Sequence, residues 1–382
     1  FNWMVGGSPC QDFSVAGKGK GAVWTCMNCK DDEGNNYQYN PLEVHYTKRD
    51  KCPKCNSTNI EKTRSSLVVK WLRILNEKKP NLAIYENVKN LVGKKHKHFF
   101  DLFINELYEY GYNTYWKVLN AKNYGIPQNR ERVYLIIIKK ELDNGKFKFP
   151  KGFDNGMRLK DLLEKEVDEK YYISQDKVDK LIAQNTVGGG RLEPKILEEN
   201  ELKFVGGIDT TDKWIDNDKD LSRNYKEGYR VYDSEGIACC QKSNGGGIGS
   251  YTGLYKVDGC STRTGNYINQ PEQIETRKDE LSNSITTVQK DSMVLMEHRI
   301  RKLIPLECFR LMGFEDKDFY ILKENGISDT QCYKMAGNSI VVDVLYYIYL
   351  ELYKAMPYLF DDIKLGSFFS GIGAFEKAII RL

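Results

Sequence analysis

The chain has 382 residues, 29% of them charged, and a net formal charge of +4. This length allows two or three domains with a real hydrophobic core, and no run of about 18 apolar residues marks a membrane span. The small positive charge is compatible with a nucleic-acid partner, although strong polyanion binders are usually more basic. Four of the ten cysteines form two Cys-x-x-Cys pairs, which indicates a reducing cytoplasm and a metal site rather than a disulfide framework.

The first 150 residues are predicted to alternate between strands and helices. Apolar runs predict strands at 3–5, 81–85, 115–119 and 133–138. Apolar residues at helical spacing predict helices over 65–76 and 99–110. This alternation is typical of a mostly parallel sheet with helices on both faces, so an α/β fold is expected.

The amino-acid composition changes after residue 150. Residues 151–290 are rich in glycine and charge, with short β-like pieces such as 229–232, and predict a smaller loop-rich domain. A compact apolar pattern then returns, and the predicted helix 341–353 ends before Pro357. We therefore expect a core domain at 1–150 with an insertion at about 22–62, a second domain at 151–290, and the rest of the core at 291–382.

Cys10 is the leading candidate for a nucleophile. It follows Pro9, just after the predicted strand 3–5. A thiolate is the strongest side-chain nucleophile near neutral pH, and open α/β sheets place reactive groups at the carboxyl ends of their strands. The alternative for this cysteine is a buried apolar role.

Three polar residues occur near the ends of two other predicted strands. Glu86 follows the strand 81–85, where a carboxyl group with a raised pKa could donate a proton or bond to a ring nitrogen. Arg130 and Arg132 lead into the strand 133–138 and could hold a carboxylate or a phosphate. The alternatives are a helix-start carboxylate for Glu86 and a solvated strand edge for the arginines.

A glycine turn near the end of the chain predicts a cofactor site. Phe369, Ser370, Gly371, Ile372 and Gly373 stand between a predicted strand and a predicted helix. Such a turn lets the backbone approach an adenosyl or phosphate group closely. In a second segment, Asn338 and Ser339 precede the helix 341–353, where a simple helix cap is the alternative.

The two Cys-x-x-Cys pairs predict a structural zinc site. Cys26 and Cys29 are separated from Cys52 and Cys55 by 22 residues, a spacing typical of zinc ribbons. Four unliganded thiols in a loop are the alternative. We expect the ribbon to stiffen the segment that contains it, or to contact a nucleic-acid backbone through its lysines.

Taken together, the motifs resemble those of the DNA (cytosine-5)-methyltransferase family. The resemblance is carried by Pro9-Cys10-Gln11, Glu86-Asn87-Val88, Gln128-x-Arg130-x-Arg132, the segment 301–314, Gly337-Asn338-Ser339 and Phe369-Ser370-Gly371-Ile372-Gly373. It covers nearly the whole chain outside 22–62 and 151–280.

The resemblance implies a Rossmann-like S-adenosylmethionine-dependent methyltransferase domain, a loop-rich target recognition domain and a zinc ribbon inserted in the catalytic loop. It implies that Cys10 attacks carbon 6 of a flipped-out cytosine, assisted by Glu86, Arg130 and Arg132. Residues 369–373, with Pro9, Asn338 and Ser339, would hold S-adenosylmethionine. The resemblance also implies that the protein is bacterial or phage-encoded and that it binds duplex DNA as a monomer. No association with a membrane is expected.

The order of these motifs is permuted, because the first cofactor motif stands at the end of the chain. The resemblance implies two further strands between that motif and Pro9-Cys10-Gln11, and neither is found. Three explanations for this order are a circular permutation, a junction of two methyltransferases, and a second polypeptide that supplies the missing strands. A restriction endonuclease would be a further partner. A tRNA cytosine-5 methyltransferase and a non-catalytic DNA-binding fragment are the alternative functions.

Overall fold

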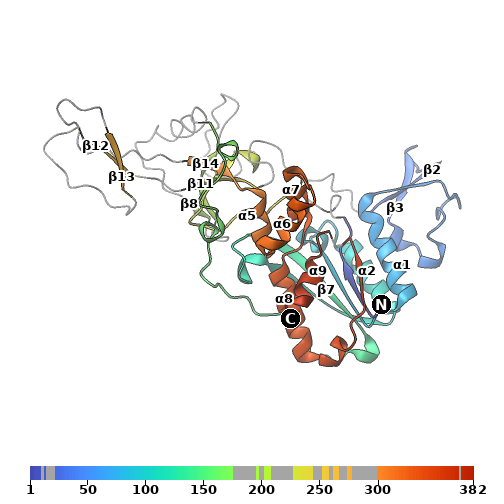
Figure 1. Ribbon diagram of the computed structural model, residues 1–382. Helices are drawn as coiled ribbons and strands as arrows, with labels where there is room; N and C mark the ends of the chain where they lie inside the picture. The colour runs from blue at the N-terminus through green and yellow to red at the C-terminus, as the bar shows by residue number, and fades with distance from the viewer. Residues whose placement is uncertain are drawn as a thin grey trace. The chain divides into compact units, whose positions relative to one another are not determined.

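The structure is a computed structural model that describes most of the chain. The described residues are 1–9, 13, 22–174, 195–197, 202–207, 227–243, 252–257, 261–265, 273–277, 299–369 and 371–382. The chain divides into two compact units (Figure 1). The first contains 1–126, 130–155 and 339–382, and the second contains 127–129 and 156–338.

The first unit is built on a five-stranded sheet with the order β15-β1-β5-β7-β6. Its strands are β1 (Trp3–Gly6), β5 (Leu82–Val88), β6 (Tyr112–Asn120), β7 (Glu131–Lys139) and β15 (Leu365–Phe368). β1 is parallel to both β15 and β5, whereas β7 is antiparallel to both β5 and β6. The expected mostly parallel sheet is confirmed, and β7 is reversed because the short link after β6 contains no crossover helix.

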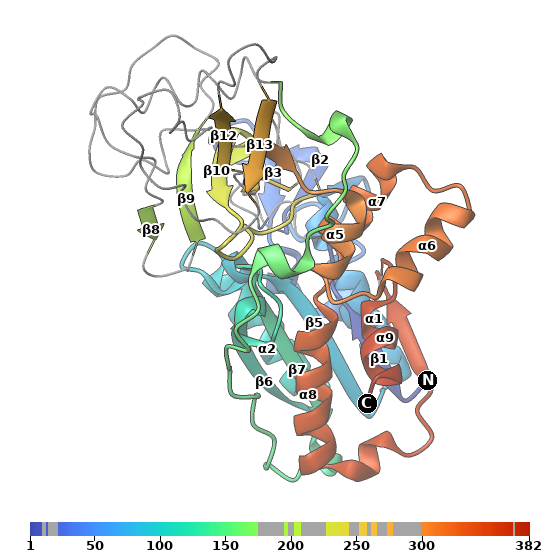
Figure 2. The same ribbon diagram turned by 60° about the vertical axis from the view of Figure 1, so that its left-hand side comes forward.

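Helices cover both faces of this sheet, as the alternation predicts. Along β1, Met4 joins an apolar cluster with α1 (Leu67–Lys78) and α2 (Lys97–Glu109). Its neighbour Trp3 points to the opposite face, where its ring lies 5.7 Å from that of Tyr349 in α8 (Val342–Ala355). Figure 2 shows α8 in front of β5 and β7. Adjacent residues of one strand therefore anchor opposite layers.

The two ends of the chain meet in this sheet. Trp3 pairs with Leu365 and Gly6 pairs with Phe368, and the backbone N–H of Asn2 donates to the carbonyl of Lys364 at 2.9 Å. After β15 the chain turns into α9 (Ala374–Ile380). The segment that leads to Cys10 and the glycine turn therefore follow neighbouring strands.

Residues 22–62 form a small three-stranded antiparallel sheet within the first unit. Its strands are β2 (Trp24–Lys30), β3 (Asn36–Tyr39) and β4 (Ile60–Lys62), with β2 in the centre. We call this segment the cysteine module. The segment has its own sheet, and its being an insertion stays a prediction.

The described residues of the second unit form a five-stranded sheet, a two-stranded sheet and three α-helices. The larger sheet has the order β14-β11-β10-β9-β8, from β14 (Arg299–Lys302), β11 (Leu254–Val257), β10 (Arg230–Asp233), β9 (Leu202–Gly207) and β8 (Lys195–Leu197). β12 (Ser261–Gly265) pairs with β13 (Gln273–Arg277), and the helices are α5 (Pro305–Arg310), α6 (Asp316–Glu324) and α7 (Asp329–Asn338). A fully buried ion pair joins Arg301 of β14 to Glu307 of α5, at 2.8 Å between Nη2 and Oε1.

None of the helices in these described segments has both the length and the hydropathy that a bilayer span requires.

Candidate active site

The candidate catalytic segments converge on one edge of the first unit's sheet. β15, β1 and β5 are neighbouring parallel strands, so their carboxyl ends meet there. The glycine turn follows β15, Gly7 to Pro9 follow β1, and Glu86 lies near the carboxyl end of β5. β7 runs the other way and begins at the same edge, where Arg132 pairs with Val88. This edge is where open α/β sheets bind ligands.

A hydrogen-bond network fixes the segment that leads to Cys10. The Ser8 hydroxyl lies 2.6 Å from the Tyr85 hydroxyl. The side-chain amide of Asn87 donates to the Ser8 carbonyl and to the Tyr85 hydroxyl, both at 3.0 Å. These buried contacts lock the end of β1 to β5. Sequence reasoning missed Ser8 and Tyr85, because nothing in their spacing marks them as partners.

Two of the predicted site residues lie outside the described residues. Cys10 follows the half-buried Pro9 directly in the sequence, and Ser370 lies within the glycine turn. Their roles stay predictions. The structure describes the residues that precede Cys10 and the residues on both sides of Ser370.

Glu86 is a buried carboxyl group held by an arginine. It is 9% exposed, and its Oε1 lies 3.3 Å from Nε of Arg132. Burial raises the pKa of Glu86, and the positive charges of Arg132 and Arg130 oppose that rise. The carboxyl therefore keeps its proton more readily than one in water, which suits a group that donates a hydrogen bond to a substrate.

Arg130 is tied to the segment that precedes α8. It is 3% exposed, and its Nη2 donates to the Ser339 carbonyl at 2.6 Å. Its backbone N–H donates to Oδ1 of Asn120 at 3.0 Å. Glu86, Arg130, Arg132 and Ser339 thus belong to one unit, whereas Asn338 ends α7 in the other unit.

The glycine turn has the backbone that close approach to a ligand requires. Gly371 and Gly373 have φ values of +60° and +77°, and the exposed Phe369 also has a positive φ, of +58°. The chain then enters α9. A side chain in this left-handed region is strained, which explains why glycines occupy two of these positions.

Several polar atoms near this turn are buried, and no described residue gives them a hydrogen-bond partner. The hydroxyls of Ser367 and Tyr349 and Oε2 of Glu376 have no hydrogen-bond partner among the described residues. Burial, together with the negative charge of Glu376, raises the pKa of Tyr349. Buried polar groups are normally satisfied, so these atoms fit a site that holds a polar ligand such as S-adenosylmethionine. Sequence reasoning did not identify any of the three.

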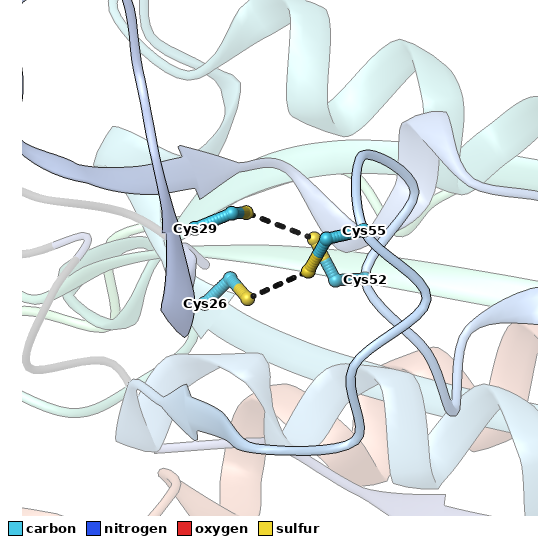
Figure 3. Close-up of side chains that lie close together, drawn as sticks. All are labelled: Cys26, Cys29, Cys52 and Cys55. Carbon is cyan, nitrogen blue, oxygen red and sulfur yellow. Dashed lines mark hydrogen bonds between the residues drawn. The ribbon is translucent and has the colours of Figure 1, made fainter.

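The four cysteines of the cysteine module come together as predicted. Cys26 and Cys29 project from β2, and Cys52 and Cys55 from the loop before β4, so that the four sulfurs point toward one another (Figure 3). Sγ of Cys26 lies 3.5 Å from that of Cys55, and Sγ of Cys29 lies 3.7 Å from that of Cys52. All four sulfurs lie within 4.8 Å of one another.

Gly7 offers a direct test of the packing at this edge. A Cβ on Gly7 would lie 2.3 Å from the Glu86 carbonyl oxygen, so Gly7→Ala is expected to push β1 away from β5. We expect the variant to melt at a lower temperature and to lose the activity of this site roughly tenfold or more. The control is Gly145→Ala, where a Cβ meets nothing and only the left-handed backbone is strained. Normal turnover by Gly7→Ala would contradict the described packing.

Comparisons with known proteins match this chain to one family. Residues 54–354 match the family model described as C-5 cytosine-specific DNA methylase. The chain is 30% identical to the orphan methyltransferase M.Rho11sI of Bacillus phage rho11s, over 92% of this chain and 84% of that protein. It is 31% identical to the orphan methyltransferase M.SPBetaI of Bacillus phage SPbeta, over 92% and 82%.

Among solved structures, the Entamoeba histolytica methyltransferase EhMeth is 16% identical, with a TM-score of 0.47 over 95% of this chain and 78% of that chain. The family match spans most of the chain, and both phage relatives align over most of their length. The chain therefore belongs to the C-5 cytosine-specific DNA methylase family.

Proposed function

We propose that this chain transfers a methyl group from S-adenosylmethionine to carbon 5 of a flipped-out cytosine in a specific duplex DNA sequence. The observation that carries the proposal is the meeting of three segments at one sheet edge. The Ser8–Tyr85–Asn87 network holds the residues before Cys10 beside the end of β5, where Arg132 holds Glu86. A nucleophile, a proton donor and a glycine turn are the parts that this reaction needs.

Cys10 is the proposed nucleophile. Its thiolate attacks carbon 6 of the cytosine, forming an S–C bond and making carbon 5 nucleophilic. Glu86, as the protonated acid, donates to the ring nitrogen and so withdraws electrons from the ring during this attack. S-adenosylmethionine supplies the electrophilic methyl group. Loss of the carbon 5 proton then breaks the S–C bond and releases Cys10.

Arg132 and Arg130 act on the Glu86 side of the site. Arg132 contacts Oε1 of Glu86, which leaves the second carboxyl oxygen to face a base. Arg130 is bonded to the Ser339 carbonyl and adds a second positive charge that acts on Glu86. Both positive charges also favour a thiolate over a thiol in their neighbourhood.

The cofactor would be held at the glycine turn. Residues 369–373 would approach it through their backbone, with Pro9, Asn338 and Ser339 around it. The positive φ values of Gly371 and Gly373 and the buried unpartnered oxygens of Ser367 and Glu376 support this assignment. The pairing of β15 with β1 supports a permuted motif order, because it places the last motif of the chain beside the Cys10 segment.

The cysteine module would hold a structural Zn²⁺. A tetrahedral Zn²⁺ with Zn–S bonds of about 2.3 Å places its sulfurs about 3.8 Å apart. The observed Sγ–Sγ separations of 3.5 and 3.7 Å match this spacing and are far too long for a disulfide. A site closed by four cysteines has no open position for catalysis.

Residues 151–290 would read the DNA target as a recognition domain. The phage origin of two relatives supports a role in phage DNA modification or in restriction–modification, with a restriction endonuclease as a partner in the second case. We propose a monomer on DNA. A complementing polypeptide would be required only if the chain alone binds its substrates without transferring the methyl group.

A methyl-transfer assay tests the proposal. The purified chain is incubated with methyl-labelled S-adenosylmethionine and either mixed-sequence duplex DNA or tRNA, and the labelled nucleoside is identified. We expect 5-methylcytosine in the DNA alone. Label in tRNA alone would support a tRNA methyltransferase, and DNA binding without label would support a non-catalytic DNA-binding fragment. Either result would overturn the proposal.

A further inference from the structure

The cysteine module is attached to helix α2 by a buried charged network. Arg49 of the module and Glu106 of α2 are each 6% exposed. Nη1 of Arg49 donates to Oε1 of Glu106 at 2.8 Å, Nη2 contacts Oε2, and the Tyr110 hydroxyl also donates to Oε1. A bidentate arginine–carboxylate pair fixes the orientation of both partners as well as their distance.

Arg49 is held from its other side by the fold of the module. Its Nε donates to the carbonyl oxygens of Pro41, at 2.7 Å, and Val44, at 2.8 Å. The guanidinium therefore points at Glu106 only while the backbone of residues 41–44 keeps its path. Two further contacts join the module to α2 and to the residue after it. His98 lies 2.9 Å from Glu43, and the ring of Tyr46 lies 5.4 Å from that of Tyr110.

The module is too small to keep this path without a further constraint. Its three strands have seven, four and three residues. Its apolar side chains do not form a separate core, because Trp24, Tyr39 and Leu42 join the cluster that covers α1 and α2. Sheets of this size normally need a disulfide or a metal to be stable.

The four cysteines of the module are positioned to hold its backbone in place through a bound metal. They join the central strand β2 to the loop that begins three residues after Arg49. In that loop the backbone N–H of Cys52 donates to Ser57 at 2.8 Å, and that of Asn56 donates to Cys52 at 2.9 Å. A bound metal would therefore fix both chain segments that flank Arg49.

The charge of the module favours this structural role over a contact with DNA. Residues 22–62 contain equal numbers of basic and acidic side chains, six of each. Four thiolates around a divalent cation would make the net charge negative. A negative module is repelled by phosphates, so a DNA-backbone contact is disfavoured.

We propose that the cysteine module is a metal-dependent brace for helix α2. Zn²⁺ bound by Cys26, Cys29, Cys52 and Cys55 folds the module, and Arg49 transmits that order to Glu106. Helix α2 and the residues before it hold Phe13 in turn. The Phe13 ring lies 5.2 Å from that of His96 and 5.3 Å from that of Phe99, and Asn90 donates to its carbonyl at 3.0 Å. Phe13 stands three residues after Cys10.

Metal removal from the whole chain tests the brace. Elemental analysis measures the bound metal, and the absorption spectrum after replacement with Co²⁺ reports thiolate ligands. Hydrogen exchange measures the protection of the backbone amides of residues 41–49 and 97–109. We expect one Zn²⁺ per chain and a tetrahedral thiolate spectrum with Co²⁺. Chelation is expected to speed exchange in both segments by on the order of tenfold or more, and added Zn²⁺ to reverse it.

Two variants separate metal binding from its transmission. Arg49→Lys keeps a charge but loses the bidentate geometry, so we expect it to retain one metal and to lose exchange protection in α2. Lys48→Met, at the exposed neighbouring residue, is the matched control and should retain both. Cys52→Ser is expected to lose the metal and the protection together, whereas Cys240→Ser should lose neither.

The brace is overturned if the purified chain holds less than one metal per chain, or if chelation leaves exchange in α2 unchanged. Loss of α2 protection in the Lys48→Met control would also count against the specific role of Arg49. Should Cys52→Ser fail to fold, reversible chelation of the unmodified chain still decides the question. None of these measurements uses methyl transfer, so they stand apart from the test of the proposed function.

Discussion

Cys10→Ala is expected to lower methyl transfer by about 10⁴-fold or more, because alanine cannot form the bond to carbon 6. DNA affinity should change little, since the substitution removes one small side chain. The assay compares single-turnover methyl transfer with DNA binding. A duplex carrying 5-fluorocytosine adds a direct readout. Fluorine at carbon 5 cannot leave as a proton does, so the unmodified protein should accumulate a stable covalent adduct that Cys10→Ala does not form.

A second cysteine provides the control for this experiment. Cys332 is fully buried in α7 of the other unit, and Cys332→Ala should keep both turnover and the adduct. The proposed role of Cys10 would be wrong if Cys10→Ala retained the adduct, or if both variants lost activity equally.

Glu86→Gln is expected to lower kcat by about 10²–10⁴-fold, the range typical for loss of a general acid. Glutamine keeps the shape of the side chain and can still donate a hydrogen bond to the base, but it has no proton to share with the ring nitrogen. Orientation of the base should survive, so KM should change much less than kcat. The exposed Glu77 of α1 is the control, since Glu77→Gln removes a carboxyl far from the sheet edge.

The pH profile distinguishes this role from a structural one. Burial raises the pKa of Glu86 above its ordinary value of 4.5, so the folded chain binds this proton more tightly than the unfolded chain does. Turnover that needs the protonated acid should fall as pH rises through the raised pKa. Arg132→Met removes a charge that lowers the pKa, so it should move this alkaline limb to higher pH.

The free energy of unfolding should also depend on pH through the titration of Glu86. Because the pKa of Glu86 is raised in the folded state, its contribution to stability is greatest below the ordinary pKa and is lost as pH rises through the folded value. Glu86→Gln has no such proton, so its loss of stability between acid and neutral pH should be smaller than that of the unmodified chain. Parallel pH dependences of unfolding in the two proteins would contradict the buried, proton-holding carboxyl.

Local periodicity was sufficient to predict most elements of the first unit. The predicted helix 99–110 is observed at Lys97–Glu109, and the predicted strand 133–138 at Glu131–Lys139. Both contain long runs of apolar residues whose spacing only one type of element can bury. The direction of β7 was not predictable in the same way, because apolar spacing is the same in a strand and in its reverse.

In the candidate site, only the residues that belong to sequence motifs could be predicted. Glu86 follows one apolar run and Arg132 precedes another, and the structure brings the two side chains together. The pair of Arg49 and Glu106 joins residues 57 positions apart and belongs to no motif, so the sequence alone could not reveal it. The unpartnered oxygens of Ser367 and Glu376 likewise became visible only once β15 and α9 were placed.

The pairing of β1 with β15 also bears on how the chain folds during synthesis. The pairing joins Trp3 to Leu365, and at 5–20 residues per second a ribosome needs about 20–70 s to make the intervening chain. Throughout that time β1, whose four residues are all buried in the finished sheet, has an unpaired edge. The strand that leads to Cys10 is thus made long before the strand that covers its edge, so chaperones that shield apolar strands should matter more for this chain than for one with local strand pairing.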